Sequence, residues 1–149
     1  MNRAETAVAT FKSGFNCSQA VLSVFCEELG LDRETSTKIA CGFGGGIGHL
    51  GETCGAVTGA IMAMGLKRGM SVKGSTYKSN MVVYALAGEL AREFTSRNRS
   101  IKCRDLLGFD ISDKEAYDEA RRKGTFYSIC PKYVSDAVEI LENLLLLHS

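Results

Sequence analysis

The sequence CPKYVSDAVEILENLLLL at residues 130–147 gives the clearest structural signal in this chain. Its apolar residues recur at intervals of three and four, the spacing of one face of an α-helix. They are Val134, Ala137, Val138, Leu141, Leu144 and Leu145. Pro131 suits the first position of a helix, with Cys130 as the N-cap. The stretch therefore predicts a terminal helix that buries one apolar stripe.

Helical periodicity extends over the rest of the chain, and Pro131 is the one proline in the whole sequence. Asn16 and Gln19 have the spacing of a capping box, and Gly30, Gly42 and Gly108 are expected to end helices. We expect helices near residues 4–13, 17–29, 32–41, 53–63, 75–97, 113–123 and 130–147, and a short helical segment that ends at Gly108. The sequence predicts an all-α, single-domain bundle, residues 1–149, of about six to seven helices with a glycine-rich loop.

The glycine-rich loop is GFGGGIGHLG, residues 42–51. It lacks the Gly-Lys-Ser/Thr ending of a nucleotide-binding loop, so we expect its backbone N–H groups to approach an anionic centre near Cys54 instead. Beyond the loop, glycine or alanine recurs every fourth residue at 51, 55, 59 and 63, which leaves a strip without side chains. We expect a helix backbone against Gly59 and Ala63. The candidates for cofactor contact are Gly45, Gly46, Gly51 and Gly55.

Four of the six cysteines fall where a helix is expected to start: Cys17, Cys54, Cys103 and Cys130. A helix N-terminus has free N–H donors and a partial positive charge, so we expect lowered thiol pKa values there. Cys26 lies on the opposite side of the helix from Cys17, and Cys41 lies at a helix C-terminus. We expect both to be packing residues, and a lone loop histidine such as His49 to be solvated.

No CxxC pair occurs, so a thioredoxin motif, a zinc knuckle and a ferredoxin run are absent from the sequence. Any four-sulfur site must be assembled by the tertiary fold. Three hypotheses remain open: an iron–sulfur cluster or other thiolate-bound metal for electron transfer or redox sensing, a metal-free thiol–disulfide pair, and a non-redox binding module with structural zinc or buried thiols.

Composition and charge argue against several other classes of function. A formal net charge of +1 gives no argument for nucleic acid, and no apolar run is long enough to cross a membrane. The N-terminus lacks the apolar region of a secretory signal, so we expect a soluble cytoplasmic protein. A homodimer is compatible with this much apolar surface. No hydrolase motif is present, and the sequence identifies no catalytic residue.

Four blocks of sequence resemble the C_GCAxxG_C_C family of redox-active proteins. They are FNCSQAV at 15–21, GFGGG at 42–46 leading to GETCGAVTG at 51–59, KCRDLLG at 102–108, and CP at 130–131. The resemblance implies that the family cysteines correspond to Cys17, Cys54, Cys103 and Cys130, and that the protein is redox active.

A related domain in some multihaem cytochromes favours electron transfer, although this chain has no CxxCH motif to attach a haem itself. Cys26 and Cys41 fall outside the family pattern. A redox partner protein is expected, and a basic connector would dock it if the partner is acidic. The connector carries Arg97, Arg99, Lys102 and Arg104.

Overall fold

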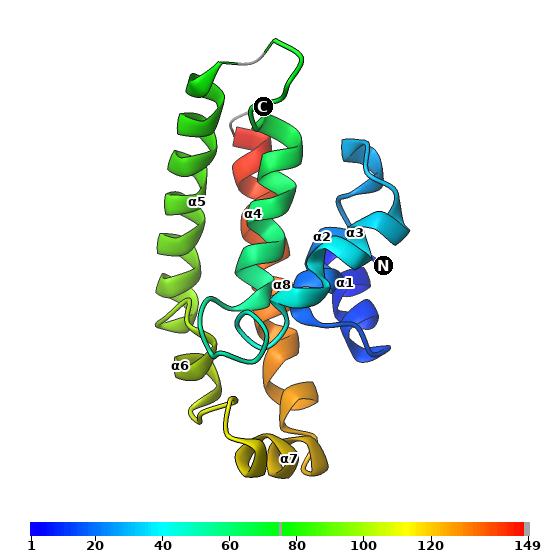
Figure 1. Cartoon of the computed structure of the whole chain (residues 1–149), viewed down its shortest axis with the longest axis vertical. Helices are drawn as coiled ribbons and strands as arrows, with labels where there is room; N and C mark the ends of the chain where they lie inside the picture. Colours follow the sequence, from blue (N-terminus) through cyan, green and yellow to red (C-terminus); the bar gives the residue numbers. More distant parts are fainter. Residues whose placement is uncertain (75, 148–149) are drawn as a thin grey trace.

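The structure is a computed structural model that describes residues 1–74 and 76–147. The described chain forms eight α-helices and two short 3₁₀ helices, without a named strand (Figure 1). They are α1 (Arg3–Lys12), α2 (Cys17–Ser23), η1 (Glu27–Leu29), α3 (Arg33–Ala40), η2 (Cys41–Phe43), α4 (Gly55–Arg68), α5 (Tyr77–Asn98), α6 (Cys103–Leu107), α7 (Lys114–Arg122) and α8 (Thr125–Leu147). The all-α prediction is confirmed, with more helices than the six to seven expected.

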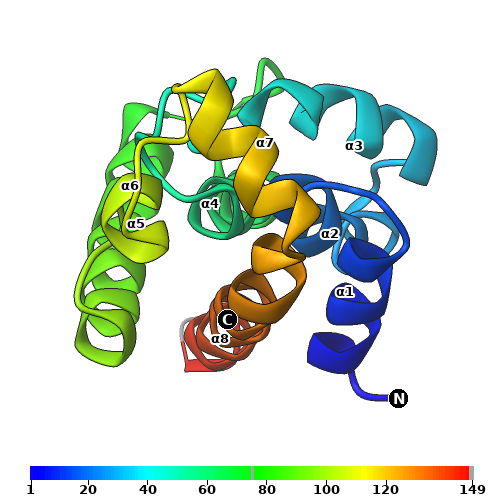
Figure 2. The same cartoon turned by 90° about the horizontal axis from the view of Figure 1, so that it is seen from below.

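Two long helices, α4 and α8, form the centre of the molecule. α4 packs against α2, α5 and α8, and α8 also packs against α1 and α5. α7 lies across the end of the molecule where α8 begins, as the view from below shows (Figure 2). The start of α4, α6 and the start of α8 therefore lie at the same end of the structure (Figure 1).

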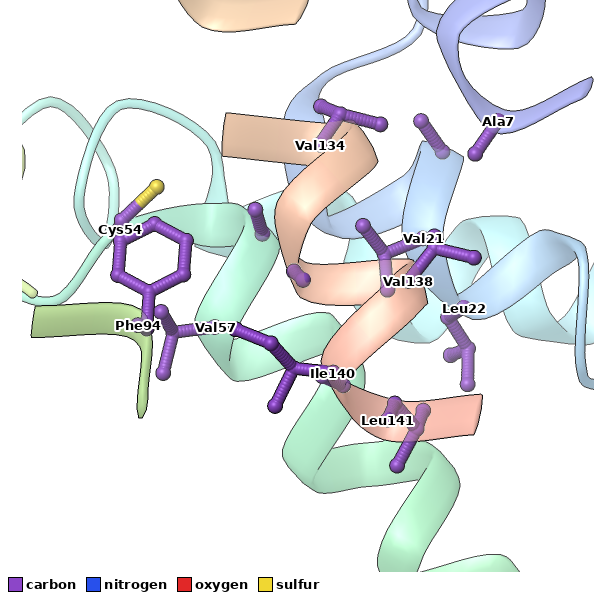
Figure 3. Packing of buried hydrophobic residues seen from close by; sticks show 14 of the residues in the cluster. Ala7, Val21, Leu22, Cys54, Val57, Phe94, Val134, Val138, Ile140 and Leu141 are labelled. Carbon is purple, nitrogen blue, oxygen red and sulfur yellow. The ribbon is translucent and has the colours of Figure 1, made fainter. Parts of the chain in front are cut away.

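The hydrophobic core lies between these helices. Val21 of α2, Val57 of α4 and Val138 of α8 are fully buried in one cluster, and Figure 3 shows the side chains of several helices converging there. The apolar stripe expected in the terminal helix is largely confirmed, because all its members are buried except the partly buried Leu145.

Local capping signals predict several helix ends correctly. Asn16 caps α2 and forms a capping box with Gln19, in which each side chain accepts a hydrogen bond at 2.9 Å from the other residue's backbone N–H. Gly108 ends α6 in the left-handed conformation. Asp113 caps α7 by accepting from the N–H of Ala116.

The expected start of the terminal helix at Cys130 is wrong. α8 begins at Thr125, and Pro131 lies inside it. Proline within a helix removes one N–H donor, and its ring crowds the carbonyl four residues earlier, so other contacts must offset this cost. Phe126 in the added turn packs against Phe109 and Tyr117, with ring centroids 6.1 and 5.5 Å apart. These contacts stabilise a helix start that the proline alone does not indicate.

Two further boundaries differ from expectation. α2 ends at Ser23, whose hydroxyl donates to the carbonyl of Ala20 and competes with helix propagation. Gly42 is not left-handed but lies within η2 after α3 has ended. The expected start of a helix at Ser75 lies outside the described residues.

Among the described residues, no helix combines the length and the apolar character that a membrane crossing requires.

Candidate functional site

Four of the six cysteines line one cavity of about 270 Å³. They come from parts of the chain that are far apart in sequence: Cys17 begins α2, Cys54 precedes α4, Cys103 begins α6 and Cys130 lies in α8. Cys54, Cys103 and Cys130 are buried, and Cys17 is partly exposed. Tertiary structure thus brings these four thiols to one place.

The start of α2 holds Cys17 beside α4. The Asn16 capping box fixes the first turn of α2, and the side-chain amide of Asn16 also donates to the carbonyl of Cys41 at 2.9 Å. The absence of a side chain at Gly55 permits the close approach, because a Cβ atom there would lie only 3.1 Å from the Cβ of Cys17.

Backbone pairing fixes Cys54 next to Cys103. The N–H of Cys54 donates to the carbonyl of Ile101 at 2.7 Å, and the N–H of Cys103 donates to the carbonyl of Glu52 at 2.6 Å. Between these bonds, Thr53 and Lys102 form an isolated antiparallel bridge. Two short segments separated by about a third of the chain are therefore held in register at the cavity wall.

Cys130 reaches the cavity from the first turns of α8. Phe126 and Tyr133, four residues before and three after it, line the same cavity, as expected for one face of a helix. The hydroxyl of Tyr133 donates to the carbonyl of Leu106 at 3.1 Å. This bond links α8 to the α6 helix that carries Cys103.

The four thiols have different proton affinities. The hydrogen bond to Cys130, followed by burial, raises the pKa of Cys17 well above its usual value. Burial raises the pKa of both Cys54 and Cys103 to about 12, and backbone N–H groups at the start of α4 offset this only in part for Cys54. In contrast, the hydrogen bond from Cys17 lowers the pKa of Cys130.

The expectation of acidic thiols at Cys17, Cys54 and Cys103 is therefore wrong. All three cysteines lie at helix starts, but the hydrogen bond to Cys130 outweighs this effect at Cys17, and burial outweighs it at Cys54 and Cys103. The pKa of Cys130 is lowered, as expected. The cause is the hydrogen bond from Cys17, because Cys130 lies inside a helix and not at its start.

The candidate glycines divide into two groups. Gly45, Gly46 and Gly55 line the cavity. A Cβ atom on Gly46 would lie 2.6 Å from the Cβ of Cys103, so the loop backbone lies directly against that cysteine. Gly51 is not a lining residue and faces the side chain of Arg104.

His49 also lines the cavity, with its backbone in the left-handed conformation and its ring centroid 4.7 Å from that of Tyr117. His49 is exposed, as expected for a solvated loop residue, and it also lines the cavity. The ring contact joins the glycine-rich segment to α7.

Aromatic side chains form much of the remaining wall, and sequence reasoning missed them. They are Phe11, Phe15, Tyr117, Phe126, Tyr127 and Tyr133. The spacing of Phe126, Cys130 and Tyr133 is the one sequence signal that could have indicated part of this set, because it places three side chains on one helix face. The others come from separate elements.

The remaining two cysteines lie outside the cavity. Cys26 is buried, and its thiol contacts the carbonyl of Ser23 at 3.4 Å, as expected for a packing residue. Cys41 is exposed, so its assignment to packing is wrong.

The basic connector is less available for docking than expected. Arg97 forms ion pairs with Asp136 and Glu139 at 3.3 and 2.8 Å. Arg104 donates to the carbonyls of Leu50 and Gly51 and lies 3.7 Å from Glu52. Two of the four basic side chains thus have partners within the protein.

The four thiols of the cavity are chemically suited to bind a metal as thiolates. They are not close enough together to bind one single ion. Thiolates bind zinc and iron–sulfur clusters, and four are present. Within the described part of the chain, however, no three side chains of the His, Cys, Asp and Glu types are grouped closely enough to hold one metal ion. The thiols share a cavity without sharing a coordination point.

A family model described as "Putative redox-active protein (C_GCAxxG_C_C)" matches residues 15–144. This chain belongs to the C_GCAxxG_C_C family. An uncharacterized protein of Archaeoglobus fulgidus is 34% identical over 133 residues, which cover 84% of this chain and 81% of that protein. No solved structure matches the chain.

The C_GCAxxG_C_C match contains all four cavity cysteines, and the family description names redox activity without naming a metal or a substrate. The family resemblance seen in the sequence is therefore confirmed. The family description does not say which metal or other group, if any, the cavity binds.

Proposed function

We propose that Cys17, Cys54, Cys103 and Cys130 hold an iron–sulfur cluster, or another thiolate-bound metal centre, that serves electron transfer or redox sensing. The observation that carries the proposal is the arrival of four thiols from four separate elements at one cavity. Burial of this many thiols in an ordinary core would not require them to face the same space.

The spacing of the thiols favours a cluster over a single zinc ion. Thiolates on one tetrahedral ion share bonds of about 2.3 Å and must crowd around one point. In a [4Fe–4S] cluster each of the four thiolates binds a different iron atom, so the sulfurs stand farther apart than on a single ion. A cavity lined by four thiols without a compact group of ligands matches the second arrangement better.

The chain's own residues supply three further conditions for such a centre. Gly46 and Gly55 bring backbone close to Cys103 and Cys17 without filling the cavity. The paired backbone around Cys54 and Cys103 fixes those two ligands relative to each other. The aromatic side chains give the cavity a partly apolar wall, which lowers the dielectric constant around the sulfurs and affects the reduction potential of any centre bound there.

Anaerobic purification followed by iron, zinc and acid-labile sulfide analysis tests the proposal. We expect iron and sulfide in the native protein, a strong loss of both in Cys103→Ser, and retention in the matched Cys41→Ser variant, because Cys41 is exposed and outside the cavity. Folded native protein without iron and sulfide would refute the cluster, and one equivalent of zinc would instead indicate a structural site.

A second candidate function is metal-free thiol–disulfide exchange between Cys17 and Cys130. The observation that favours it is their side-chain hydrogen bond, in which Cys17 donates and Cys130 accepts. The Cys130 thiolate would attack a disulfide of a partner protein and release one partner thiolate. Cys17 would then lose its proton, attack the mixed disulfide and release the second partner thiolate.

The net reaction converts a dithiol and a partner disulfide into a disulfide and a partner dithiol. Differential alkylation and mass spectrometry test this candidate. We expect a reversible Cys17–Cys130 disulfide in metal-free protein treated with an oxidised dithiol. A pair of free thiols after that treatment would exclude the exchange function.

A further inference from the structure

The helix α5 carries two apolar stripes on roughly opposite sides. Leu86, Leu90 and Phe94 form the first stripe, and they are buried where α5 packs against α4 and α8. The second stripe, named here the α5 outer face, follows the same helical spacing but points away from the core. It consists of Tyr77, Met81, Tyr84, Gly88 and Ala91.

The large residues of the α5 outer face are widely exposed. The relative exposures of Tyr77, Met81 and Tyr84 are 61%, 54% and 57%. The first buried residue of α5 is Leu86, and in the first two turns of the helix only the partly buried Val83 packs against the core. A helix with apolar residues on both sides normally has both sides covered.

Local contacts hold these side chains together in one patch. A side-chain hydrogen bond joins Tyr84 to Tyr77, which lies seven residues, or about two helical turns, earlier. The amide of Asn80 donates to the sulfur of Met70 at 3.6 Å, which adds another exposed methionine beside the stripe. At about 100 Å² for each large side chain, the patch exposes roughly 400 Å², about half of one partner's share in a standard interface.

The size gradient along the α5 outer face identifies what would cover it. The large side chains occupy its N-terminal half and the small residues Gly88 and Ala91 occupy its C-terminal half. Tyr77 and Ala91 stand seven positions before and after Tyr84. Two copies of α5 packed antiparallel about Tyr84 would therefore place the large half of each copy over the small half of the other.

We propose that the α5 outer face is a homodimer interface in which two copies of α5 pack antiparallel across a two-fold axis near Tyr84. Such an interface is isologous, so one surface must complement itself, as this size gradient does. Charge agrees with the same pairing, because Lys78 of one copy would lie near the turn that carries Glu93 in the other. This proposal does not depend on what the cysteine cavity holds.

Sedimentation equilibrium over about a hundredfold range of concentration tests the proposal. We expect the native protein to form a dimer and Tyr84→Glu to be a monomer with unchanged helix content by circular dichroism. Ile39→Glu is the matched control, since Ile39 is a similarly exposed apolar residue on α3, and we expect it to remain dimeric.

Cysteine cross-linking tests the antiparallel orientation and does not depend on the behaviour of Tyr84→Glu. We expect a mixture of Tyr77→Cys and Ala91→Cys chains to give a disulfide-linked dimer that neither chain forms alone. A native protein that stays monomeric would overturn the proposal. This holds also if the monomer binds lipid vesicles through this patch. A dimer that survives Tyr84→Glu or lacks the mixed cross-link would overturn it equally.

Discussion

Cys17 and Cys130 form a pair of unequal thiols in the cavity wall. Cys17 keeps its proton, because it donates to Cys130 and is buried, whereas Cys130 gains acidity from the same bond. The hydrogen bond therefore concentrates negative charge on one of the four sulfurs. This asymmetry matters for either proposed chemistry, since a thiolate is both the metal ligand and the attacking nucleophile.

We predict that Cys17→Ala raises the pKa of Cys130 in the metal-free protein. Alanine removes the hydrogen-bond donor, and burial then acts on Cys130 without the compensating bond. The ultraviolet absorbance of the thiolate, followed against pH and compared with Cys26→Ala as a control, measures the change. An unchanged titration would show that the Cys17 bond does not set the acidity of Cys130.

We also predict that the metal-free, reduced protein loses stability as pH rises from about 9 towards 12. The pKa of Cys54 and of Cys103 is about 12 in the folded protein, against about 8.5 in an unfolded chain. The folded state therefore holds these protons longer, which stabilises it below the unfolded pKa and ceases to do so above the folded pKa.

Denaturant unfolding at a series of pH values measures this effect. The decline should be smaller in Cys54→Ser, because serine does not ionise in this range. Equal declines in the two proteins would contradict a buried, neutral Cys54.

Single-residue signals predict local structure well and burial poorly. Asn16 and Gly108 have the expected capping roles because these depend on bonds within a few residues. The acidity expected at Cys17 is also a local argument, but it fails because the hydrogen bond to Cys130, followed by burial, keeps the proton on Cys17. Nothing within a few residues of Cys17 indicates either cause.

At the scale of helices, the contact between α2 and α4 sets the position of Cys17. A Cβ atom on Gly59 would lie 2.6 Å from the backbone carbonyl oxygen of Ser18, so the two helix backbones touch there. The expectation that a helix backbone covers Gly59 is confirmed. Gly65 lies further along the same helix, with nothing within 4 Å of its own Cβ position.

We predict opposite effects of alanine at these two glycines. Gly59→Ala should destabilise the protein by about 1–3 kcal/mol, because a methyl group would force α2 away from α4. Gly65→Ala should stabilise it by about 0.5–1 kcal/mol through the lower backbone entropy of the unfolded chain. Denaturant unfolding measures both, and equal effects would contradict the close contact between α2 and α4.

A polar network ties α5 to α8. Asp136 of α8 accepts from Asn98 at 3.1 Å and from Lys132 at 2.7 Å, and it also pairs with Arg97. Although burial alone would raise the pKa of Asp136, these partners together lower it. The network explains why Arg97 is not free to recruit a partner protein.

We predict that Asp136→Asn costs about 1–3 kcal/mol at neutral pH, because it leaves a partly buried cation without its counter-charge. The lowered pKa of Asp136 stabilises the native fold above about pH 4 and loses that effect as the pH falls through the folded value. The stability difference between variant and native protein should therefore shrink on acidification. A constant difference across this range would contradict the charged network.

At the scale of the whole molecule, sequence periodicity predicts the all-α class and tertiary contacts determine the cavity. The apolar stripe at 134–145 predicts α8 because burial repeats with the helix period. The aromatic wall contributed by Phe11, Tyr117 and Phe126 has no such repeat, since these residues come from three helices. Only the assembled fold shows that they surround the same space as the thiols.

The central claim is that one metal centre joins the four cavity cysteines. A crystal structure of anaerobically purified protein, with anomalous scattering recorded at the iron absorption edge, tests it most directly. We predict iron atoms within about 2.3 Å of the sulfurs of Cys17, Cys54, Cys103 and Cys130. Four metal-free sulfurs in that structure, from protein that remains folded throughout purification, would contradict the account.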